Sequence, residues 1–390
     1  MQLCEEKKCT GCMACFNVCK HDAISVKEKH GFLYPIIDKE KCVNCGLCSK
    51  VCPELQKVDR KEPMNKIAYA VFNLDKQQRD ASSSGGVFIT LARYIINMGG
   101  VIYGAAYDAN LSVNHIRISK LEDIHFLQGS KYVQSNIGST YRLVENDLNA
   151  GLFVLFSGVS CQIAGLRKYL RKGYEKLYMV EVLCHGGASP VAFRNHLLYI
   201  SKQNHSKVTD VNFRYKTEER CQNLKYVFAN GKSLILSQPL DDIYYKGFLG
   251  GVLLRNSCFQ CSHVGINRCG DILIADFWGV DRDKIVYPDK MTYVSLVLVF
   301  TDKGADIFKA CHSFWSVVER PLAEAVNGNL ALKRCIPYSK WNSRFFDELD
   351  SLGYEKAAEH CLSSHFNIKE ALKGLLGPTI TKIVLRLLRR

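Results

Sequence analysis

A run of four closely spaced cysteines that occurs twice constrains this chain more than any other feature. Cys9, Cys12, Cys15 and Cys19 follow a C-x2-C-x2-C-x3-C spacing. The same spacing returns 33 positions later at Cys42, Cys45, Cys48 and Cys52, and Pro53 follows it. This is the ligand spacing of bacterial two-cluster ferredoxins, in which three cysteines of one run and the last cysteine of the other hold each 4Fe-4S cluster.

The crossed ligation predicts two 4Fe-4S clusters in a ferredoxin-type domain of residues 1–56. One cluster takes Cys9, Cys12, Cys15 and Cys52, and the other takes Cys42, Cys45, Cys48 and Cys19. The two-residue gaps curl the backbone around a cubane, and the small residues Gly11, Ala14 and Gly46 allow close approach. Zinc is the weaker alternative, because it usually takes two C-x2-C pairs separated by a longer loop.

Three features of the first 60 residues depart from a typical free ferredoxin. Lys20 stands where a proline usually follows the first run, and the segment carries ten basic against eight acidic side chains. Cys4 lies outside both runs. We expect it to be a spare thiol rather than a ligand.

The composition indicates where and how such a chain works. Its 390 residues suggest two to three domains, and the 52 basic and 38 acidic residues give a net charge of +14. Nine of the 18 cysteines lie in the first 52 residues, and a chain of this length is not a small disulfide scaffold. The chain does not open on a secretory signal, and apolar runs such as 293–300 are too short to cross a membrane. We therefore expect a cytoplasmic protein whose clustered cysteines are metal ligands or redox groups.

The rest of the chain predicts a mixed α/β fold. Residues 57–66 are expected to be a linker, residues 67–345 an α/β core with parts 67–145 and 146–345, and residues 346–390 a helical tail. Within the core, strands are predicted at 68–72 and 101–103 and a helix at 87–97. The Ser82–Gly86 loop before that helix has two interpretations that stay open: a phosphate site at the helix N-terminus, or a tight turn with an N-cap.

A second alternating unit brings two more cysteines to one edge of the sheet. Strands at 152–156 and 178–183 flank a helix at 162–170, after a loop at 157–161, so the two strands should run parallel. Cys161 and Cys184 then follow the carboxyl ends of these strands, where ligands gather in open α/β sheets.

Two loop cysteines complete a possible third set of ligands. Cys258 and Cys261 precede a strand predicted at 271–276, and with Cys161 and Cys184 they could hold a further cluster, for which Cys269 is a rival fourth ligand. The alternative is that Cys161 and Cys184 are small buried apolar residues and that the later pair binds nothing. Four cysteines without cysteine neighbours are expected to be core or surface thiols: Cys221, Cys311, Cys335 and Cys361.

Several motifs occur in an order that resembles one known family. They are Ser83 to Phe88, Gln128 to Ser135, Phe156 to Leu166, Cys184-His185-Gly186, Cys258-x2-Cys261 and Asp271 to Gly279. Together they resemble the coenzyme F-420 hydrogenase/dehydrogenase beta-subunit family, here with an N-terminal ferredoxin module. Two positions depart from the family pattern: Ser160 stands where proline is common, and Cys269 where a residue without a thiol is usual.

The resemblance implies FAD and a core 4Fe-4S cluster. The implied cluster ligands are Cys161, Cys184, Cys258 and Cys261, and the implied flavin contacts are Ser83, Ser84, Gly85, Gly86, Ser130, Lys131 and Tyr132. Three side chains keep two interpretations each. Lys131 holds negative charge on a flavin or phosphate, or is a solvated surface lysine. His185 relays a proton, or is satisfied by a loop backbone. Asp276 binds a ribose hydroxyl, or caps a turn. No catalytic residue is assigned.

These features predict an oxidoreductase that passes electrons between 4Fe-4S clusters and a two-electron carrier, such as reduced coenzyme F-420, through FAD. A flavin suits this task because it exchanges one or two electrons. The expected partner is a redox protein or a small carrier. The alternative is an electron-transfer subunit of a larger redox or polysaccharide-biosynthesis system, without its own substrate. Nucleic-acid binding is disfavoured, because the chain lacks a basic-aromatic motif and most of its positive charge is spread out.

The exception to that spread is the C-terminus, which predicts a basic amphipathic helix. Residues 371–390 contain five basic and no acidic side chains, and Ile380, Ile383, Val384, Leu387 and Leu388 recur at helical spacing. Such a helix could lie on the inner face of a membrane, dock a partner protein or pack on its own core.

Overall fold

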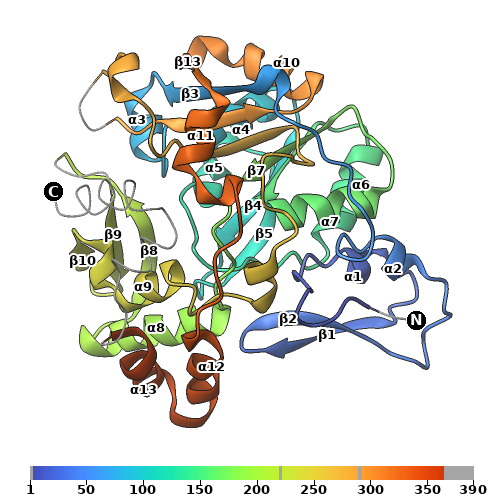
Figure 1. Cartoon of the computed structure of the whole chain (residues 1–390), viewed down its shortest axis with the longest axis vertical. Coiled ribbons are helices and arrows are strands. Elements are labelled where there is room, and N and C mark those ends of the chain that lie inside the picture. The colour runs from blue at the N-terminus through green and yellow to red at the C-terminus, as the bar shows by residue number, and fades with distance from the viewer. Residues whose placement is uncertain (1–2, 219–221, 289–291, 364–390) are drawn as a thin grey trace.

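An eight-stranded mixed sheet organises the larger part of the molecule (Figure 1). The computed structural model describes residues 3–218, 222–288 and 292–363. The strand order is β13-β3-β12-β11-β7-β6-β4-β5. The bounds are β3 Ile67–Asn73, β4 Val101–Tyr107, β5 Val113–Ile118, β6 Val154–Val159, β7 Leu177–Val182, β11 Ile272–Asp276, β12 Ser295–Val299 and β13 Trp315–Pro321. The four middle strands run parallel and the outer ones antiparallel, so the prediction of a mixed α/β fold is confirmed.

The predicted β-α-β unit lies at the middle of this sheet. β6 pairs in parallel with β7, with Phe156 opposite Met179, and α7 (Ser160–Leu170) connects them. The prediction of a loop at 157–161 is wrong, because β6 continues to Val159 and α7 begins at the next residue, Ser160. The Gln162 side chain accepts a hydrogen bond from the Val159 N–H at 3.1 Å and so caps the helix. Cys161 therefore lies in the first turn of α7.

Alternate side chains of the parallel strands pack on opposite faces of the sheet. Ile102 and Leu155 pack with α4 (Val87–Asn97), α5 (Ile124–Leu127) and α10 (Asp302–Ala310). Tyr103 and Phe156 point the other way, toward α6 (Thr140–Asn149) and α7. The helix predicted at 87–97 is confirmed at both ends. It begins after Gly86, whose φ of 87° favours glycine.

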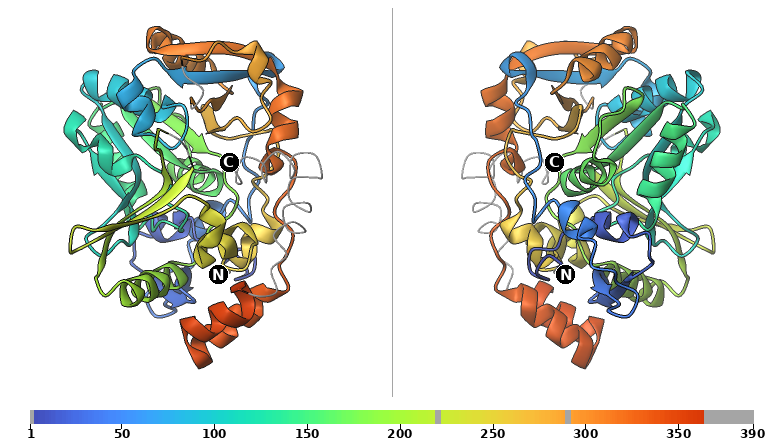
Figure 2. Two further views of the ribbon diagram at one scale, coloured as in Figure 1. Left: turned by 90° about the vertical axis from the view of Figure 1, so that its left-hand side faces the viewer. Right: turned by 90° about the vertical axis from the view of Figure 1, so that its right-hand side faces the viewer.

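The N-terminal ferredoxin region packs against this second face. It contains the hairpin β1 (Ile24–Lys29) and β2 (Phe32–Ile37) and the short helices α1 (Ala14–Val18) and α2 (Leu47–Lys50). Met13 and Val18 share a buried core with Ile163 and Leu166 of α7. In the side views of Figure 2 this region lies at the end of the molecule away from β13.

The segment expected to be a linker lies against the core. Val58 is buried, and Lys61 exchanges two backbone hydrogen bonds with Arg268, at 2.8 and 2.9 Å. This contact joins the end of the ferredoxin region to the loop before β11.

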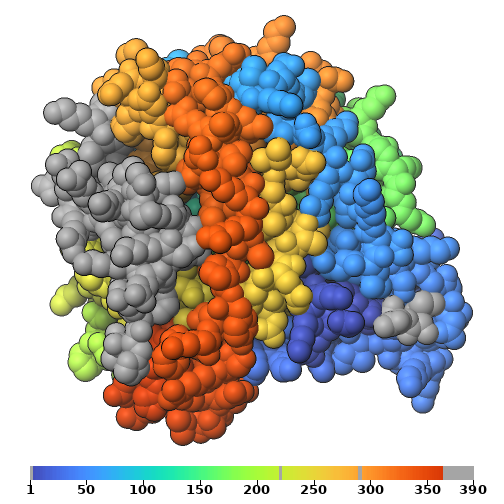
Figure 3. Space-filling view, in the orientation of Figure 1, coloured from blue at the N-terminus to red at the C-terminus, as the bar shows by residue number. Residues whose placement is uncertain are grey.

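A smaller antiparallel sheet and several helices form the remainder. Its strands are β8 (Val208–Tyr215), β9 (Asn223–Phe228) and β10 (Ser233–Leu236). The remaining helices are α3 Lys76–Asp80, α8 Pro190–Gln203, α9 Ile243–Leu249, α11 Leu322–Gly328, α12 Trp341–Leu352 and α13 Tyr354–Ala358. Figure 3 shows the chain after β13, in orange, crossing one face of the molecule toward α12.

The predicted C-terminal helical tail is described only in part. Residues 346–363 are mostly helical, whereas the basic amphipathic segment at 378–390 lies outside the described residues. Across the described part of the chain, no helix combines the length and apolar character needed to cross a membrane.

Candidate metal centre

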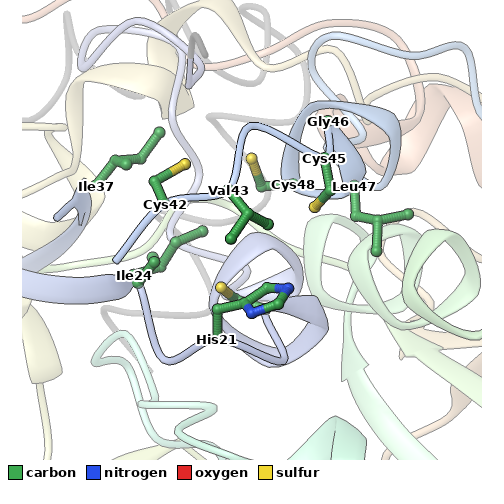
Figure 4. Close-up of a pocket in the computed structure, with 11 residues that line it drawn as sticks. His21, Ile24, Ile37, Cys42, Val43, Cys45, Gly46, Leu47 and Cys48 are labelled. Carbon is green, nitrogen blue, oxygen red and sulfur yellow. The ribbon is translucent and has the colours of Figure 1, made fainter. Parts of the chain in front are cut away.

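Two pockets in the ferredoxin region separate the eight motif cysteines into the predicted sets. We call the first the outer pocket; its cysteines are Cys19, Cys42, Cys45 and Cys48. We call the second the inner pocket; its motif cysteines are Cys9, Cys12, Cys15 and Cys52. Figure 4 shows Cys42, Cys45 and Cys48 around the outer pocket. In both pockets the last cysteine of one run joins three cysteines of the other.

Apolar side chains and tight loops line the outer pocket. Ile24, Ile37 and Leu47 supply apolar walls, and Gly46 turns the chain into α2 with a φ of 77°. Cys45 is exposed and Val43 is 58% exposed, so this pocket lies close to solvent.

The inner pocket is pressed against the core. Cys9 and Cys12 are buried, and a Cβ added at Gly165 of α7 would lie 2.9 Å from the Cys12 Cβ. Gly165 therefore permits the close contact between α7 and the inner cysteine loop. Burial raises the pKa of Cys12 to about 12, so that thiol stays protonated at neutral pH unless a metal replaces the proton.

One buried arginine links the inner pocket to the core cysteine loops. Arg255 is 1% exposed and donates to the backbone oxygens of Cys9 at 2.7 Å and Leu33 at 2.9 Å. Its guanidinium carbon lies 4.1 Å from the Tyr34 ring centroid, a cation–π contact. Its own carbonyl accepts from the Cys258 N–H at 2.9 Å. Its positive charge also opposes the rise in pKa that burial causes at Cys9 and Cys258.

The structure brings the four predicted core cysteines together. Cys161 lies in the first turn of α7, Cys184 follows β7, and Cys258 and Cys261 lie in and just after the 3₁₀ turn Asn256–Gln260. Burial raises the pKa of Cys161, and the neighbouring Cys184, Cys261 and Cys258 raise it further. Backbone N–H groups face two of the sulfur atoms: Gly187 donates to Cys258 at 3.3 Å, and His263 donates to Cys261 at 3.4 Å.

The grouping of the motif cysteines in the two pockets is that of cubane ligands. Over the described ranges, no three His, Cys, Asp or Glu side chains meet as ligands of one metal ion. A cubane binds one thiolate at each iron, so its four ligands surround a group of atoms instead of a point.

Cys269, the rival ligand, takes part in a different contact. Its thiol donates to Glu181 Oε1 at 3.6 Å, and its backbone N–H donates to the same oxygen at 3.0 Å. Arg268 lies 3.8 Å from Glu181 and donates to Ser160 Oγ at 2.8 Å. Ser160, which departs from the family pattern, thus accepts a hydrogen bond from a buried arginine.

Residues implied as flavin contacts meet from two loops. The backbone N–H of Ser130 donates to Ser83 Oγ at 2.7 Å, and the two hydroxyls lie 3.0 Å apart. Ser84 donates to the Val294 carbonyl, and Gly85 is packed so closely that an added Cβ would lie 2.4 Å from the Val71 oxygen.

Lys131 is held by the backbone of its own loop. Its Nζ donates to the carbonyls of Gln128 at 2.7 Å and Phe126 at 3.0 Å. Burial lowers its pKa to about 7.

Tyr132, His185 and Asp276 lie in one aromatic and charged neighbourhood. The Tyr132 ring stacks on Phe248 at 4.8 Å, and the His185 ring lies 5.1 Å from the same phenylalanine. His185 also contacts the Leu249 carbonyl at 3.2 Å, and burial lowers its pKa. Asp276 forms a buried ion pair with Arg214 at 2.6 Å, a partner that the sequence did not indicate. Arg214 also donates to the Tyr132 hydroxyl at 3.3 Å.

The remaining described cysteines outside the motifs lie in three different places. Cys311 is buried at the end of α10, and Cys361 is buried after α13. Cys335 donates to the Phe259 carbonyl at 3.0 Å and lies near enough to Cys258 and Cys261 to raise their pKa values. Cys221 lies outside the described residues.

Comparison with known proteins gives similarity in two parts of the chain. Residues 153–322 match the family described as the C-terminal region of the coenzyme F420 hydrogenase/dehydrogenase beta subunit. Residues 8–55 and 34–83 match two models described as 4Fe-4S dicluster domain.

Two individual proteins are similar to the chain. An uncharacterized ferredoxin of Methanocaldococcus jannaschii is 43% identical over 47 residues, which are 11% of this chain and 28% of that relative. The chain therefore spans less than a third of its length. A chain of the F420-reducing NiFe hydrogenase complex from Methanosarcina barkeri is 17% identical with a TM-score of 0.46, over 77% of this chain and 91% of that one.

The family matches confirm the resemblance that the ordered motifs predicted. They also confirm a region for two 4Fe-4S clusters at the N-terminus. The chain thus joins a region similar to the C-terminal part of the coenzyme F420 hydrogenase/dehydrogenase beta subunit, at residues 153–322, to a 4Fe-4S dicluster region at residues 8–55.

Proposed function

We propose that this chain is a flavin- and iron-sulfur-dependent oxidoreductase that passes electrons between its clusters and a two-electron carrier such as coenzyme F-420. One observation carries the proposal: three sets of four cysteines form a continuous series from the surface to the sheet edge. The outer pocket lies near solvent, and α1, which contains Cys15 and ends just before Cys19, joins it to the inner pocket. Arg255 connects the inner pocket to the core cysteines, because it donates to the Cys9 carbonyl and accepts from the Cys258 N–H; Cys12 also lies near enough to Cys161 to raise its pKa.

The core set, Cys161, Cys184, Cys258 and Cys261, is proposed to hold a third 4Fe-4S cluster. All four thiols have pKa values raised by burial, so each is protonated at neutral pH while it has no metal. Bound iron would replace these protons, and the N–H groups of Gly187 and His263 would stabilise the thiolates they face.

FAD is proposed to bind beside the loops that Ser83 and Ser130 join. A bound flavin supplies the exchange between one-electron and two-electron chemistry. Lys131 would place a positive charge near it, and a lysine with a pKa of about 7 can also hold or release a proton. Tyr132 and His185, which both contact the Phe248 ring, connect this neighbourhood to Cys184.

Chemical analysis of the anaerobically purified full chain tests both parts of the proposal. We expect about twelve irons, because each of three cubanes holds four, together with one FAD. Cys184→Ser should lower the iron content to about eight and leave the other clusters in place. Cys311→Ser is the matched control, because Cys311 is a buried thiol that lies apart from the core set. Eight irons in the unaltered chain would refute the core cluster, and absence of flavin would refute the FAD site.

A second candidate is an electron-transfer subunit that has no substrate of its own. The solvent-facing outer pocket favours it, because an exposed cluster can exchange electrons with a docked protein. Steady-state turnover of the purified chain with reduced coenzyme F-420, NAD(P)H or reduced ferredoxin separates the two candidates. Turnover with F-420 or NAD(P)H supports the enzyme, whereas exchange only with a protein partner supports the subunit.

The domain limits and the location of the chain belong to the same proposal. We place the ferredoxin domain at 1–56, the joining segment at 57–66, the core at 67–345 and the tail at 346–390, in the cytoplasm. Deleting residues 378–390 tests a membrane or partner role for the tail: unchanged liposome binding and unchanged co-purification of partners would refute both roles.

A further inference from the structure

The inner pocket contains one more cysteine than a cubane requires. Cys4 lines it together with the four motif cysteines Cys9, Cys12, Cys15 and Cys52. The outer pocket is lined by four cysteines. Cys4 precedes the dicluster match, which begins at residue 8, and the spacing of the two runs assigns it no role.

The segment that carries Cys4 is anchored at several points. The Glu5 carbonyl accepts from the N–H groups of Lys8 and Cys9, both at 2.9 Å, and so forms a turn into the first cysteine run. Glu6 pairs with Lys29 of β1 at 2.7 Å, and the Lys7 carbonyl accepts from Gln260 Nε2 at 3.1 Å. The position of Cys4 is therefore supported by the hairpin and by the loop of core cysteines.

Cys4 and Cys52 line the same pocket and lie near each other. The Cys4 thiol donates to the Glu5 carbonyl at 3.5 Å, and the proximity of the two sulfur atoms raises the pKa of Cys4 and lowers that of Cys52. Cys9, which also lines the pocket, is near enough to raise the pKa of Cys4 further. Two sulfur atoms thus compete for the same corner of the pocket, where a cubane needs one thiolate at one iron.

We propose that Cys4 is a reserve ligand of the inner 4Fe-4S cluster, able to replace Cys52 at the same iron. In the exchange, the iron–sulfur bond to Cys52 would break and a bond to Cys4 would form. The Cys4 thiol would give its proton to the released Cys52 thiolate, so charge, protons and iron oxidation state all balance. The inference rests on the ferredoxin clusters alone, and it stands or falls independently of the flavin and the core cluster.

Serine variants of the full chain, purified anaerobically, test the proposal by iron and sulfide content. Cys4→Ser and Cys52→Ser should each keep the iron content of the unaltered chain, because one of the two thiols remains. The double variant should lose between one iron, as a three-iron cluster, and the four irons of the whole inner cluster. Cys19→Ser is the matched control, because the outer pocket has no additional lining cysteine: this single change alone should cause a comparable loss.

Electron paramagnetic resonance of the reduced protein separates ligand loss from misfolding. In the double variant the outer-cluster signal should persist, which shows that the region is still folded. Loss of iron from Cys52→Ser equal to that of the double variant would overturn the proposal. A loss confined to Cys4→Ser would also overturn it, because Cys4 would then be the resident ligand. So would a Cys4–Cys52 disulfide in the cluster-loaded protein.

Discussion

The inner and outer pockets arise from the same cysteine spacing but lie in different surroundings. The outer pocket has apolar walls, an exposed Cys45 and a half-exposed Val43. The inner pocket faces α7, has the buried cation Arg255 beside Cys9 and contains a fifth thiol. A repeated motif therefore specifies what each pocket binds, whereas the surface that each pocket packs on gives the two bound groups different electrostatic surroundings and access to solvent.

Among the changes that affect only one of the two pockets, replacing Arg255 beside the inner pocket should lower stability the most. Arg255→Met removes the donor from the buried Cys9 carbonyl and the partly buried Leu33 carbonyl, and each unsatisfied buried group costs about 1–3 kcal/mol. We expect the free energy of unfolding to fall by about 2–6 kcal/mol in anaerobic urea denaturation. Lys39→Met, an exposed cation of the same region, should change it by no more than about 0.5 kcal/mol.

The same variant tests whether the two clusters differ in potential. Loss of a nearby positive charge disfavours an added electron, so the midpoint potential of the inner cluster should fall while that of the outer cluster stays constant. In Arg255→Lys, which keeps the charge, the midpoint potential of the inner cluster should lie between that of Arg255→Met and that of the unaltered chain. Equal shifts at both clusters in a redox titration would contradict a local role for Arg255.

Filling the contact between α7 and the inner loop should have the next largest effect. The added methyl group of Gly165→Ala would lie 2.9 Å from both Cys12 Cβ and the Tyr141 hydroxyl. Overpacking costs about 1–3 kcal/mol, and the better helix propensity of alanine offsets up to about 1 kcal/mol of it. We expect a net loss of about 1–2 kcal/mol and a perturbed inner-cluster spectrum. Gly173→Ala is the control, because nothing lies within 4 Å of its Cβ position, and an equal loss there would contradict the packing argument.

Unequal exposure should appear as unequal rates of cluster loss. With ferricyanide and EDTA, the iron of the outer cluster should be released about tenfold faster than that of the inner cluster, a barrier difference of about 1.4 kcal/mol. Iron release followed together with the two paramagnetic signals measures both rates. Simultaneous loss of the two signals would show that burial of Cys9 and Cys12 gives the inner cluster no protection.

Local sequence patterns predicted the parts of this molecule that depend on local geometry. Cysteine spacing within each run, the helix at 87–97 and the parallel strands around α7 all depend on neighbours along the chain. Spacing also predicted the four-cysteine sets that line the two pockets. The predicted start of α7 at residue 162 was wrong, because the Gln162 side chain caps the helix earlier than the apolar pattern suggests.

Contacts between distant segments could not be predicted in this way. Arg255 lies 246 residues from Cys9, and no periodicity marks a buried arginine as the partner of a cysteine loop. The bond between Cys269 and Glu181 and the pair of Arg214 and Asp276 likewise join separate elements. Such contacts become visible only when the sheet and the ferredoxin region are placed together.

The smallest predicted effect concerns Glu6, which anchors the Cys4 segment to β1. Its hydrogen bond from Lys29 lowers the Glu6 pKa below the usual 4.5, so the stabilisation is present above that pH and is lost as the pH falls through the lowered value. The pair is exposed and screened by salt, so Glu6→Gln should cost about 0.5 kcal/mol or less at neutral pH. The effect should grow in the Cys52→Ser background, because the inner cluster would then depend on Cys4 and on the segment that carries it. Iron retention at low and high salt measures this. Glu28→Gln, on the same hairpin, should leave it unchanged, and an equal loss from the two variants would show that general surface charge, rather than the anchored segment, stabilises the inner cluster.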